Sequence, residues 1–233
     1  MNTAAAPAGR HDLVITLVTL AVLLAWDASG WDLSVARWFG GAAGFAWRDA
    51  WWARTLLHDG GRALAWLLLA TLALSALAPV PTVMRPSRAQ RWRWTGMVLL
   101  CVLAVPLVKQ FSTTSCPWDL AEFGGTAHYV SHWRWGLVDG GGGHCFPSGH
   151  AVAAFAFFGM YFLWRDHDTQ RARLWLAGVL VAGALFGWAQ LARGAHYPSH
   201  TLWSAWLCWA LCAGAAAWRP MRLPAWQRSS SSN

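Results

Sequence analysis

The residues of this chain that are best suited to chemistry are histidines close to turn-forming residues. The segment Phe146–His150 reads Phe-Pro-Ser-Gly-His and stands at the start of an apolar stretch. Proline suits the first turn of a helix, Ser148 can cap that turn, and Gly149 allows the backbone to approach a ligand closely. Because free N–H groups at a helix start bind anions, we expect Ser148 and Gly149 to hold a phosphate-like anion beside His150.

Four more polar residues stand at the ends of apolar stretches. Lys109, the only lysine in the chain, ends one stretch, Arg193 ends another, and His196 and His200 bracket the start of a third. Each of them alone could be an anchor at a membrane surface. If the stretches cross a membrane, all four meet His150 at one face, and together they suit the binding and transfer of a phosphoryl group.

The composition indicates the elements that must position these residues. Hydrophobic residues make up 56% of the chain and charged residues only 12%, which is typical of a protein surrounded by lipid. About 20 apolar residues are needed to cross a bilayer as a helix. Stretches that approach this length predict an all-α, polytopic membrane bundle of about six transmembrane helices, at 13–26, 62–83, 95–112, 150–165, 174–192 and 200–218.

The first of these stretches has two interpretations. It is short and follows Arg10, as in a cleaved signal peptide, but Trp31 and Leu33 could extend it into a retained, tilted helix. We favour a retained helix. One membrane domain is then expected over residues 1–228, followed by a short disordered tail at 229–233.

Basic residues indicate the orientation in the membrane. With both termini in the cytoplasm, the arginines at 10, 85–93, 165–173 and 219–228 all lie inside, as the positive-inside rule requires. The net charge of +8 therefore reflects topology, and no nucleic-acid partner is expected. We expect a multi-pass protein of the bacterial inner membrane, with the histidines that could do chemistry on the periplasmic side.

The loop regions carry two further patterns. Cys116 and Cys145 share one periplasmic loop, where either a disulfide or two free thiols would fit the sequence. Residues 44–58 alternate tryptophans and charged residues at helical spacing, which predicts an amphipathic helix lying on the outer membrane surface.

The order and spacing of the polar residues resemble the type-2 phosphatidic acid phosphatase (PAP2) family. That family has a lysine, six residues and Arg-Pro, then Pro-Ser-Gly-His, then Ser-Arg, five residues, a histidine, three residues and an aspartate. Lys109, Pro147–His150 and His196 match this signature over about residues 95–205. The resemblance implies that His196 is the nucleophile, that His150 protonates the leaving group and activates water, and that the phosphoryl oxygens are bound by Lys109, Ser148, Gly149 and Arg193.

Two arginines of the family signature are missing from their expected places. Cys116 stands where the first arginine is expected, and Gln190 stands at the second. Arg193 lies one helical turn after Gln190 and could contact phosphate from nearly the same face, with Arg134 as a second candidate.

The carboxylate of the signature is also missing. His200 stands where the aspartate is expected. His200 could accept a hydrogen bond from the Nδ1 side of His196 if its own facing nitrogen is unprotonated, and Asp119 is the other candidate to orient the nucleophile.

The resemblance implies a membrane phosphatase that hydrolyses a lipid phosphate or pyrophosphate at the periplasmic face. The substrates considered are undecaprenyl pyrophosphate, phosphatidylglycerol phosphate, phosphatidic acid and the phosphates of lipid A. A lipid phosphotransferase and a non-catalytic protein that binds or transports lipid phosphates are the alternatives.

Metal-dependent catalysis is a chemical rival. His128 and His132 are spaced as a zinc pair on a helix, but no His-Glu-x-x-His motif accompanies them and Gly124-Gly125 just before favours a loop. No metal or other cofactor is therefore expected in the reaction.

Overall fold

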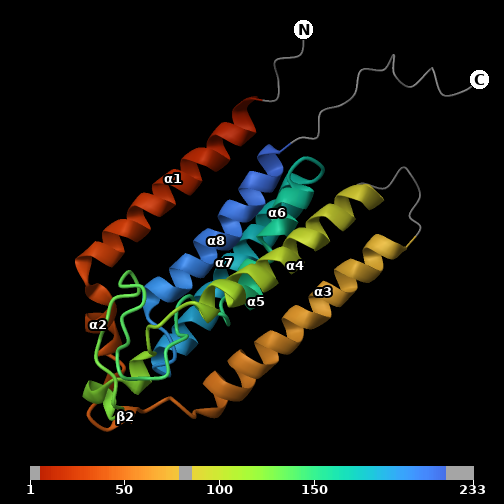
Figure 1. Cartoon of the computed structure of the whole chain (residues 1–233). Helices are drawn as coiled ribbons and strands as arrows, with labels where there is room; N and C mark the ends of the chain where they lie inside the picture. The colour runs from red at the N-terminus through yellow and green to blue at the C-terminus, as the bar shows by residue number, and fades with distance from the viewer. Residues whose placement is uncertain (1–5, 79–85, 219–233) are drawn as a thin grey trace, which may run out of the picture.

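The computed structural model of the chain describes residues 6–78 and 86–218 and is an all-α bundle (Figure 1). Helices α1 (Ala6–Ser29), α3 (Gly61–Leu77), α4 (Arg88–Gln110) and α7 (Thr169–Ala192) are its long, apolar members. Each belongs to a continuous helical segment of 21 to 26 residues that is apolar enough to cross a membrane. These four segments indicate a multi-pass membrane protein.

Two further helical regions complete the bundle but are not among the four long apolar segments. The stretch expected at 150–165 forms two short helices, α5 (Val152–Phe155) and α6 (Phe158–Trp164). Helix α8 (Pro198–Ala217) has 20 residues and begins with proline in its first turn. The end of the stretch expected at 62–83, the tail expected at 229–233 and the arginines at 85, 219, 222 and 228 lie outside the described residues.

The first turns of helices α4 and α7 are capped by the side chain of the residue just before each helix. Helix α4 begins with a capping box, in which the Ser87 hydroxyl accepts from the Gln90 N–H and the Gln90 side chain accepts from the Ser87 N–H. Helix α7 begins at Asp168, whose carboxylate accepts from the N–H of Arg171. These caps fix where each helix enters the bundle.

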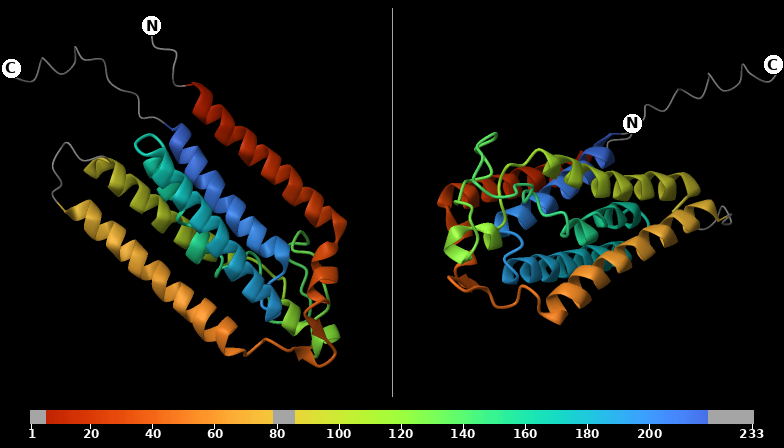
Figure 2. Two further views of the ribbon diagram at one scale, coloured as in Figure 1. Left: turned by 180° about the vertical axis from the view of Figure 1, so that it is seen from behind. Right: turned by 60° about the horizontal axis from the view of Figure 1, so that its bottom comes forward.

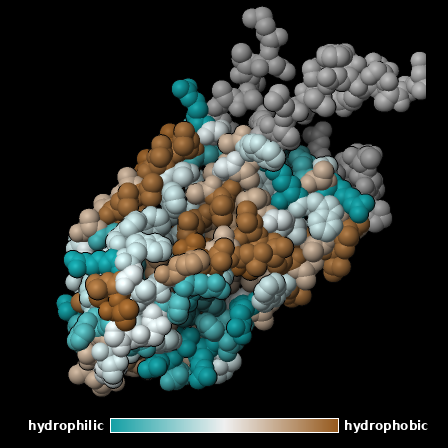
Figure 3. Space-filling view, in the orientation of Figure 1, coloured by the Kyte–Doolittle hydropathy of each residue, from teal (hydrophilic) through white to brown (hydrophobic). Residues whose placement is uncertain are grey.

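The core lies around α5 and α6, which are buried along most of their length. Phe155, Phe158 and Phe162 pack against Val98 of α4 and Trp209 of α8 in the largest hydrophobic cluster. Helices α1 and α3 lie on opposite sides of the bundle (Figure 2). Hydrophobic side chains cover the middle of the helices, and hydrophilic ones gather towards the ends (Figure 3). This banding matches a bilayer around the bundle.

Helix α1 is joined to the rest of the bundle by polar contacts. Asp12 forms an ion pair with Arg165 at 2.7 Å between Oδ2 and Nη1. The Trp206 indole N–H donates to the carbonyl of Thr16, and the Trp209 indole N–H donates to its hydroxyl. These contacts join α1 to the end of α6 and to α8.

The amphipathic helix expected at 44–58 takes a different form. Gly44–Phe45 is strand β2, which pairs with β1 (Gly40–Gly41) in a short hairpin, because Gly44 adopts a positive φ of 89°. A wide helical segment, η1 (Trp52–Gly60), then continues without a break into α3. The segment is thus the start of a long helix, anchored where the Trp52 ring stacks on that of Trp188 at 5.1 Å.

Candidate active site

A cavity of about 500 Å³ lies at the end of the bundle where η1, the 111–151 loop, the end of α7 and the segment before α8 meet. The loop carries two short helical turns, η2 (Pro117–Asp119) and η3 (Ala121–Phe123). Five of the residues predicted to bind or transfer the phosphoryl group line this cavity: Lys109, Gly149, His150, Arg193 and His196. The fold therefore brings together residues from four separate segments.

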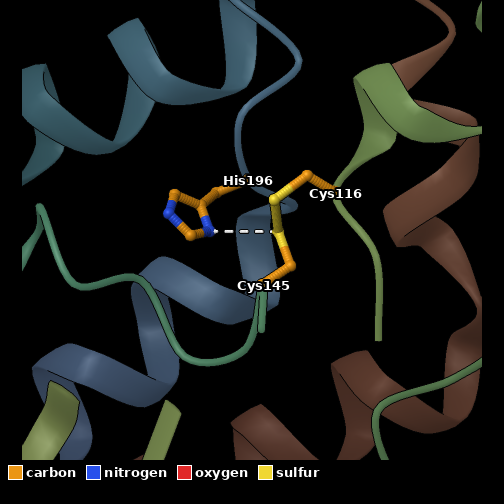
Figure 4. Close-up of side chains that lie close together, drawn as sticks. All are labelled: Cys116, Cys145 and His196. Atoms are coloured by element: carbon orange, nitrogen blue, oxygen red, sulfur yellow. Dashed lines mark hydrogen bonds between the residues drawn. A yellow bond between two sulfur atoms is a disulfide. The ribbon is translucent and has the colours of Figure 1, made fainter. Parts of the chain in front are cut away.

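The Nδ1 atom of His196 faces two neighbouring side chains, one of which is drawn in Figure 4. Its Nδ1 lies 3.5 Å from Cys145 Sγ and 3.4 Å from Nδ1 of His200. Burial, with the charge of Lys109 nearby, keeps the pKa of His196 well below its usual value. The imidazole is therefore neutral, and Nε2 is the ring nitrogen that remains for chemistry.

Cys116 and Cys145 form a disulfide, with their Cα atoms 5.1 Å apart. The bond fastens the start of the loop to the segment before His150. The two sulfurs and His196 lie close enough to share an ion. Thiolates are the sulfur ligands that metals need, however, and a disulfide offers none.

His200 occupies the position of the missing carboxylate and is fully buried. Its carbonyl accepts from the N–H of Ser148, which holds the start of α8 against the turn at Ser148 and Gly149. Among the described residues, no partner is found for His200 Nε2. A proton on Nε2 would leave Nδ1 free to accept from Nδ1–H of His196.

Asp119 does not take the orienting position suggested by the sequence. Its carboxylate accepts from the N–H of Cys116 at 3.3 Å, and no hydrogen bond to His196 is found in the described part of the chain. A carboxylate at the third position of a tight turn readily caps that turn, and this local bond keeps Asp119 out of the cavity lining.

Ser148 also differs from its predicted part as a phosphate contact. It is fully buried, it does not line the cavity, and its hydroxyl accepts from the N–H of Ala151. Helix α5 begins at Val152, two residues after the start of the stretch expected at 150–165. Among the described residues, no hydrogen-bond partner is found for the N–H groups of Gly149 and His150, which leaves two backbone donors at this turn.

His150 lines the cavity just before α5. Its Nε2 lies 3.2 Å from the carbonyl of Leu57, and its ring stacks on that of His58 at 4.5 Å. Burial, assisted by the charge of His58, lowers the pKa of His150 to about 4. The side chain is therefore neutral near pH 7 until an anionic ligand raises its affinity for a proton.

Arg193 reaches the cavity from the end of α7. Its Nε donates to the carbonyl of Arg48 at 2.8 Å, and its guanidinium lies 5.9 Å from the Trp118 ring centroid. The terminal nitrogens are left for an anion. Gln190 also lines the cavity, whereas Arg134 is exposed and does not.

Two lining residues, His58 and Arg62, were not singled out as site residues from the sequence. They lie four residues apart on one continuous helix, so both side chains face the same way. The signal that could have found them is the polar run His58–Arg62 directly before an apolar stretch. Such polar residues at a span boundary are equally typical of membrane anchors.

The fold and cavity define a helical membrane protein with a cationic, histidine-containing site at one end of the bundle. The chain belongs to the PAP2 superfamily, whose family model matches residues 91–224. No curated protein and no solved structure matches the chain. His58 and Arg62 precede the segment that matches the family model, but both line the cavity.

Proposed function

We propose that the protein is a lipid phosphatase that removes a phosphoryl group through a phosphohistidine on His196. The observation that carries this proposal is the neutral, buried His196 in one cavity with His150 and three cationic side chains. Membership of the PAP2 superfamily suggests the same type of activity. Lys109, Arg193 and Arg62 would neutralise the phosphoryl oxygens, with the Gly149 and His150 N–H groups as further donors.

The reaction would proceed in two displacements. The bound phosphate first lets His150 take up a second proton from solvent. Nε2 of His196 then attacks phosphorus in line, the bond from phosphorus to the lipid oxygen breaks, and that oxygen takes this proton from His150. A water then gives its proton to His150 and attacks phosphorus, which breaks the bond to Nε2 and releases phosphate. Throughout, His200 Nδ1 would accept the Nδ1 proton of His196 and hold the ring in place.

An apolar groove beside the cavity supports a lipid as the substrate. It shares Arg62, Gly149 and Ala153 with the cavity and continues between α3 and α4 along Leu69 and Val102. A phosphate held at the cationic end would place a hydrocarbon chain along this groove and towards the bilayer. Candidate substrates are undecaprenyl pyrophosphate, phosphatidylglycerol phosphate, phosphatidic acid and lipid A phosphates.

The proposal includes a topology of six spans, with α5 and α6 together forming one span and α8 the last. The first described residues of α1 and the last of α8 then lie at the cytoplasmic end of the bundle, and the cavity lies at the periplasmic end (Figure 1). Arg165, which pairs with Asp12, stands on the inner side as the positive-inside rule favours.

Phosphate release tests the proposal. Detergent-solubilised wild type and His196→Ala are incubated with the four classes of lipid phosphate, without added metal. We expect the wild type to release phosphate from at least one class and His196→Ala to be slower by about 10³-fold or more. Comparable rates for the two proteins would contradict the assignment of His196.

A further inference from the structure

Three ionisable side chains meet in a second place, away from the cavity lining. Asp27 lies near the end of α1, Asp32 lies in the first turn of α2 (Trp31–Ala36), and His132 lies in the 111–151 loop. Each offers one ligand atom, and these atoms all lie within 4.8 Å of one another. The side chains of His132 and Asp27 are only 6% and 3% exposed, and Asp32 is buried as well.

Neutral donors surround the two carboxylates. Oδ2 of Asp27 accepts from the indole N–H groups of Trp133 and Trp203, at 3.0 and 2.8 Å. Asp32 accepts from the Trp26 indole N–H and from both the backbone N–H and the hydroxyl of Ser199. Among the described residues, neither carboxylate forms an ion pair with a lysine or arginine.

Two buried carboxylates without a cation are costly, because burial removes the water that would otherwise stabilise their charges. Two polar atoms at this site without a hydrogen-bond partner within residues 6–78 and 86–218 indicate that a cation could balance these charges. In the described part of the chain, Asp27 Oδ1 and His132 Nε2 are buried and have no hydrogen-bond partner. A free imidazole nitrogen and a free carboxylate oxygen at one point form a typical donor pair for a metal ion.

The spacing of the donor atoms supports a metal more than a hydrogen bond. His132 Nε2 lies 3.4 Å from Asp27 Oδ2, without the alignment of a hydrogen bond. In tetrahedral zinc sites the nitrogen and oxygen ligands stand about 2.0–2.2 Å from the ion, so they are separated from each other by about 3.4 Å. His132 Nε2 and the Asp27 carboxylate are therefore close enough to share one ion, and the unpartnered Oδ1 is the carboxylate oxygen left to bind it.

We propose that Asp27, Asp32 and His132 bind one divalent transition-metal ion of the zinc class, with water as the fourth ligand. One nitrogen and two oxygen donors suit such an ion better than a soft, thiolate-preferring one. The ion would balance the buried carboxylates and tie α1 and α2 to the loop. It is a structural ion, separate from the phosphoryl-transfer steps.

This site adjoins the segment that carries His196 and His200. Asp32 holds Ser199, the residue before His200, and the His132 ring packs edge-on against that of His200 at 5.7 Å. A metal on Asp32 and His132 would thus stiffen the start of α8. Its binding can be measured without any substrate, so it stands or falls independently of the proposed phosphatase activity.

Zinc binding by the tag-free, full-length protein in detergent tests the inference. The protein is stripped with a chelator and titrated with Zn²⁺, and Co²⁺ replaces it in a second titration, where a tetrahedral N/O site gives visible absorption. We expect one ion per chain. Asp27→Asn, which can still accept from the two indoles, and His132→Gln should each bind at least about tenfold more weakly.

His128→Ala is the matched control, because His128 is an exposed histidine of the same loop, four residues from His132. It should bind zinc as the wild type does. A stripped wild type that takes up no zinc overturns the inference, whatever the variants do. The same holds if the Asp27→Asn and His132→Gln double variant retains the ion, or if His128→Ala loses it to the same extent as His132→Gln.

Discussion

At the scale of single residues, the site depends on which nitrogen of His196 carries a proton. With Nδ1 facing Nδ1 of His200 at 3.4 Å, a proton on Nδ1 is shared with His200 and the lone pair of Nε2 stays free. A carboxylate would stabilise the charged ring more strongly than His200 does. A neutral His200, in turn, is easier to bury, and His200 is fully buried here.

The low pKa of His150 predicts a pH dependence of stability. Between pH 6.5, the usual pKa, and about 4, His150 takes up a proton in the unfolded chain but not in the folded one. The unfolded state then binds more protons, so the free energy of unfolding decreases as the pH is lowered through this window.

Thermal unfolding of wild type and His150→Gln at pH 7 and pH 4.5 checks this. The wild-type Tm should fall by about 3 °C more than that of the variant, since glutamine cannot take up the proton. His196 contributes in the same direction and remains in both proteins, so the difference isolates His150. Equal decreases in Tm would show that His150 titrates alike in both states.

The residue scale also shows how far spacing alone can predict a site. Lys109, His150 and His196 line the cavity as expected because the helices that they adjoin end at one face of the bundle. Ser148 and Asp119 do not, since each is engaged by a backbone N–H three residues away. Such local bonds depend on the turn that the backbone adopts, which the spacing of the motif does not specify.

At the scale of elements, the continuous helix from Trp52 to Leu77 adds to the site from outside the family match. It places Arg62 in both the cavity and the apolar groove. The sequence predicted a separate surface helix at 44–58, because tryptophans at helical spacing fit an interface as well as they fit the start of a long helix. Sequence patterns do not settle where one helix ends and the next begins.

Removal of Arg62 tests the contribution of this helix. Arg62→Ala should lower kcat/KM by about 10–100-fold, because a charge-assisted contact to the phosphoryl group is lost. Arg54→Ala is the matched control, since Arg54 lies on the same helix and, like Arg62, is exposed and pairs with an aspartate, but does not line the cavity. If both variants have the same kcat/KM, Arg62 does not contact the substrate.

The disulfide predicts a dependence of stability on redox state. Replacing Cys116 and Cys145 together with serine should reduce stability by about 2–4 kcal/mol, because the loop between them is no longer closed. A reducing agent should lower the Tm of the wild type towards that of the double variant and leave the variant unchanged. A wild-type Tm that does not respond to reduction would mean that the bond does not support the loop.

At the scale of the whole molecule, the composition and the loop charges predicted a helical membrane bundle, and four long apolar segments agree with it. The count of six spans could not be settled in the same way. One stretch is broken into α5 and α6, and the first turn of α8 contains the polar residues Ser199, His200 and Thr201. Both are enclosed by neighbouring helices, so less of their surface has to match lipid.

The orientation in the membrane can be measured by treating spheroplasts, whose inner membrane is intact, with a membrane-impermeant thiol reagent. Arg134→Cys should be labelled from outside and Asp166→Cys only after the membrane is opened, since both are exposed, Arg134 in the 111–151 loop that borders the cavity and Asp166 in the connection from α6 to α7. The native free cysteines are all buried, which keeps the background low. The reverse labelling pattern would place the cavity in the cytoplasm.

The central claim, a phosphohistidine on His196, is tested most directly by trapping the phosphorylated enzyme. Wild type, His196→Ala and His150→Gln are mixed with a radiolabelled lipid phosphate that the wild type hydrolyses and are denatured in alkali, in which phosphohistidine survives. We expect label on the wild type, none on His196→Ala, and accumulation on His150→Gln if water attack becomes slow. Label on His196→Ala, or turnover by the wild type with no labelled protein at any time point, would contradict the account.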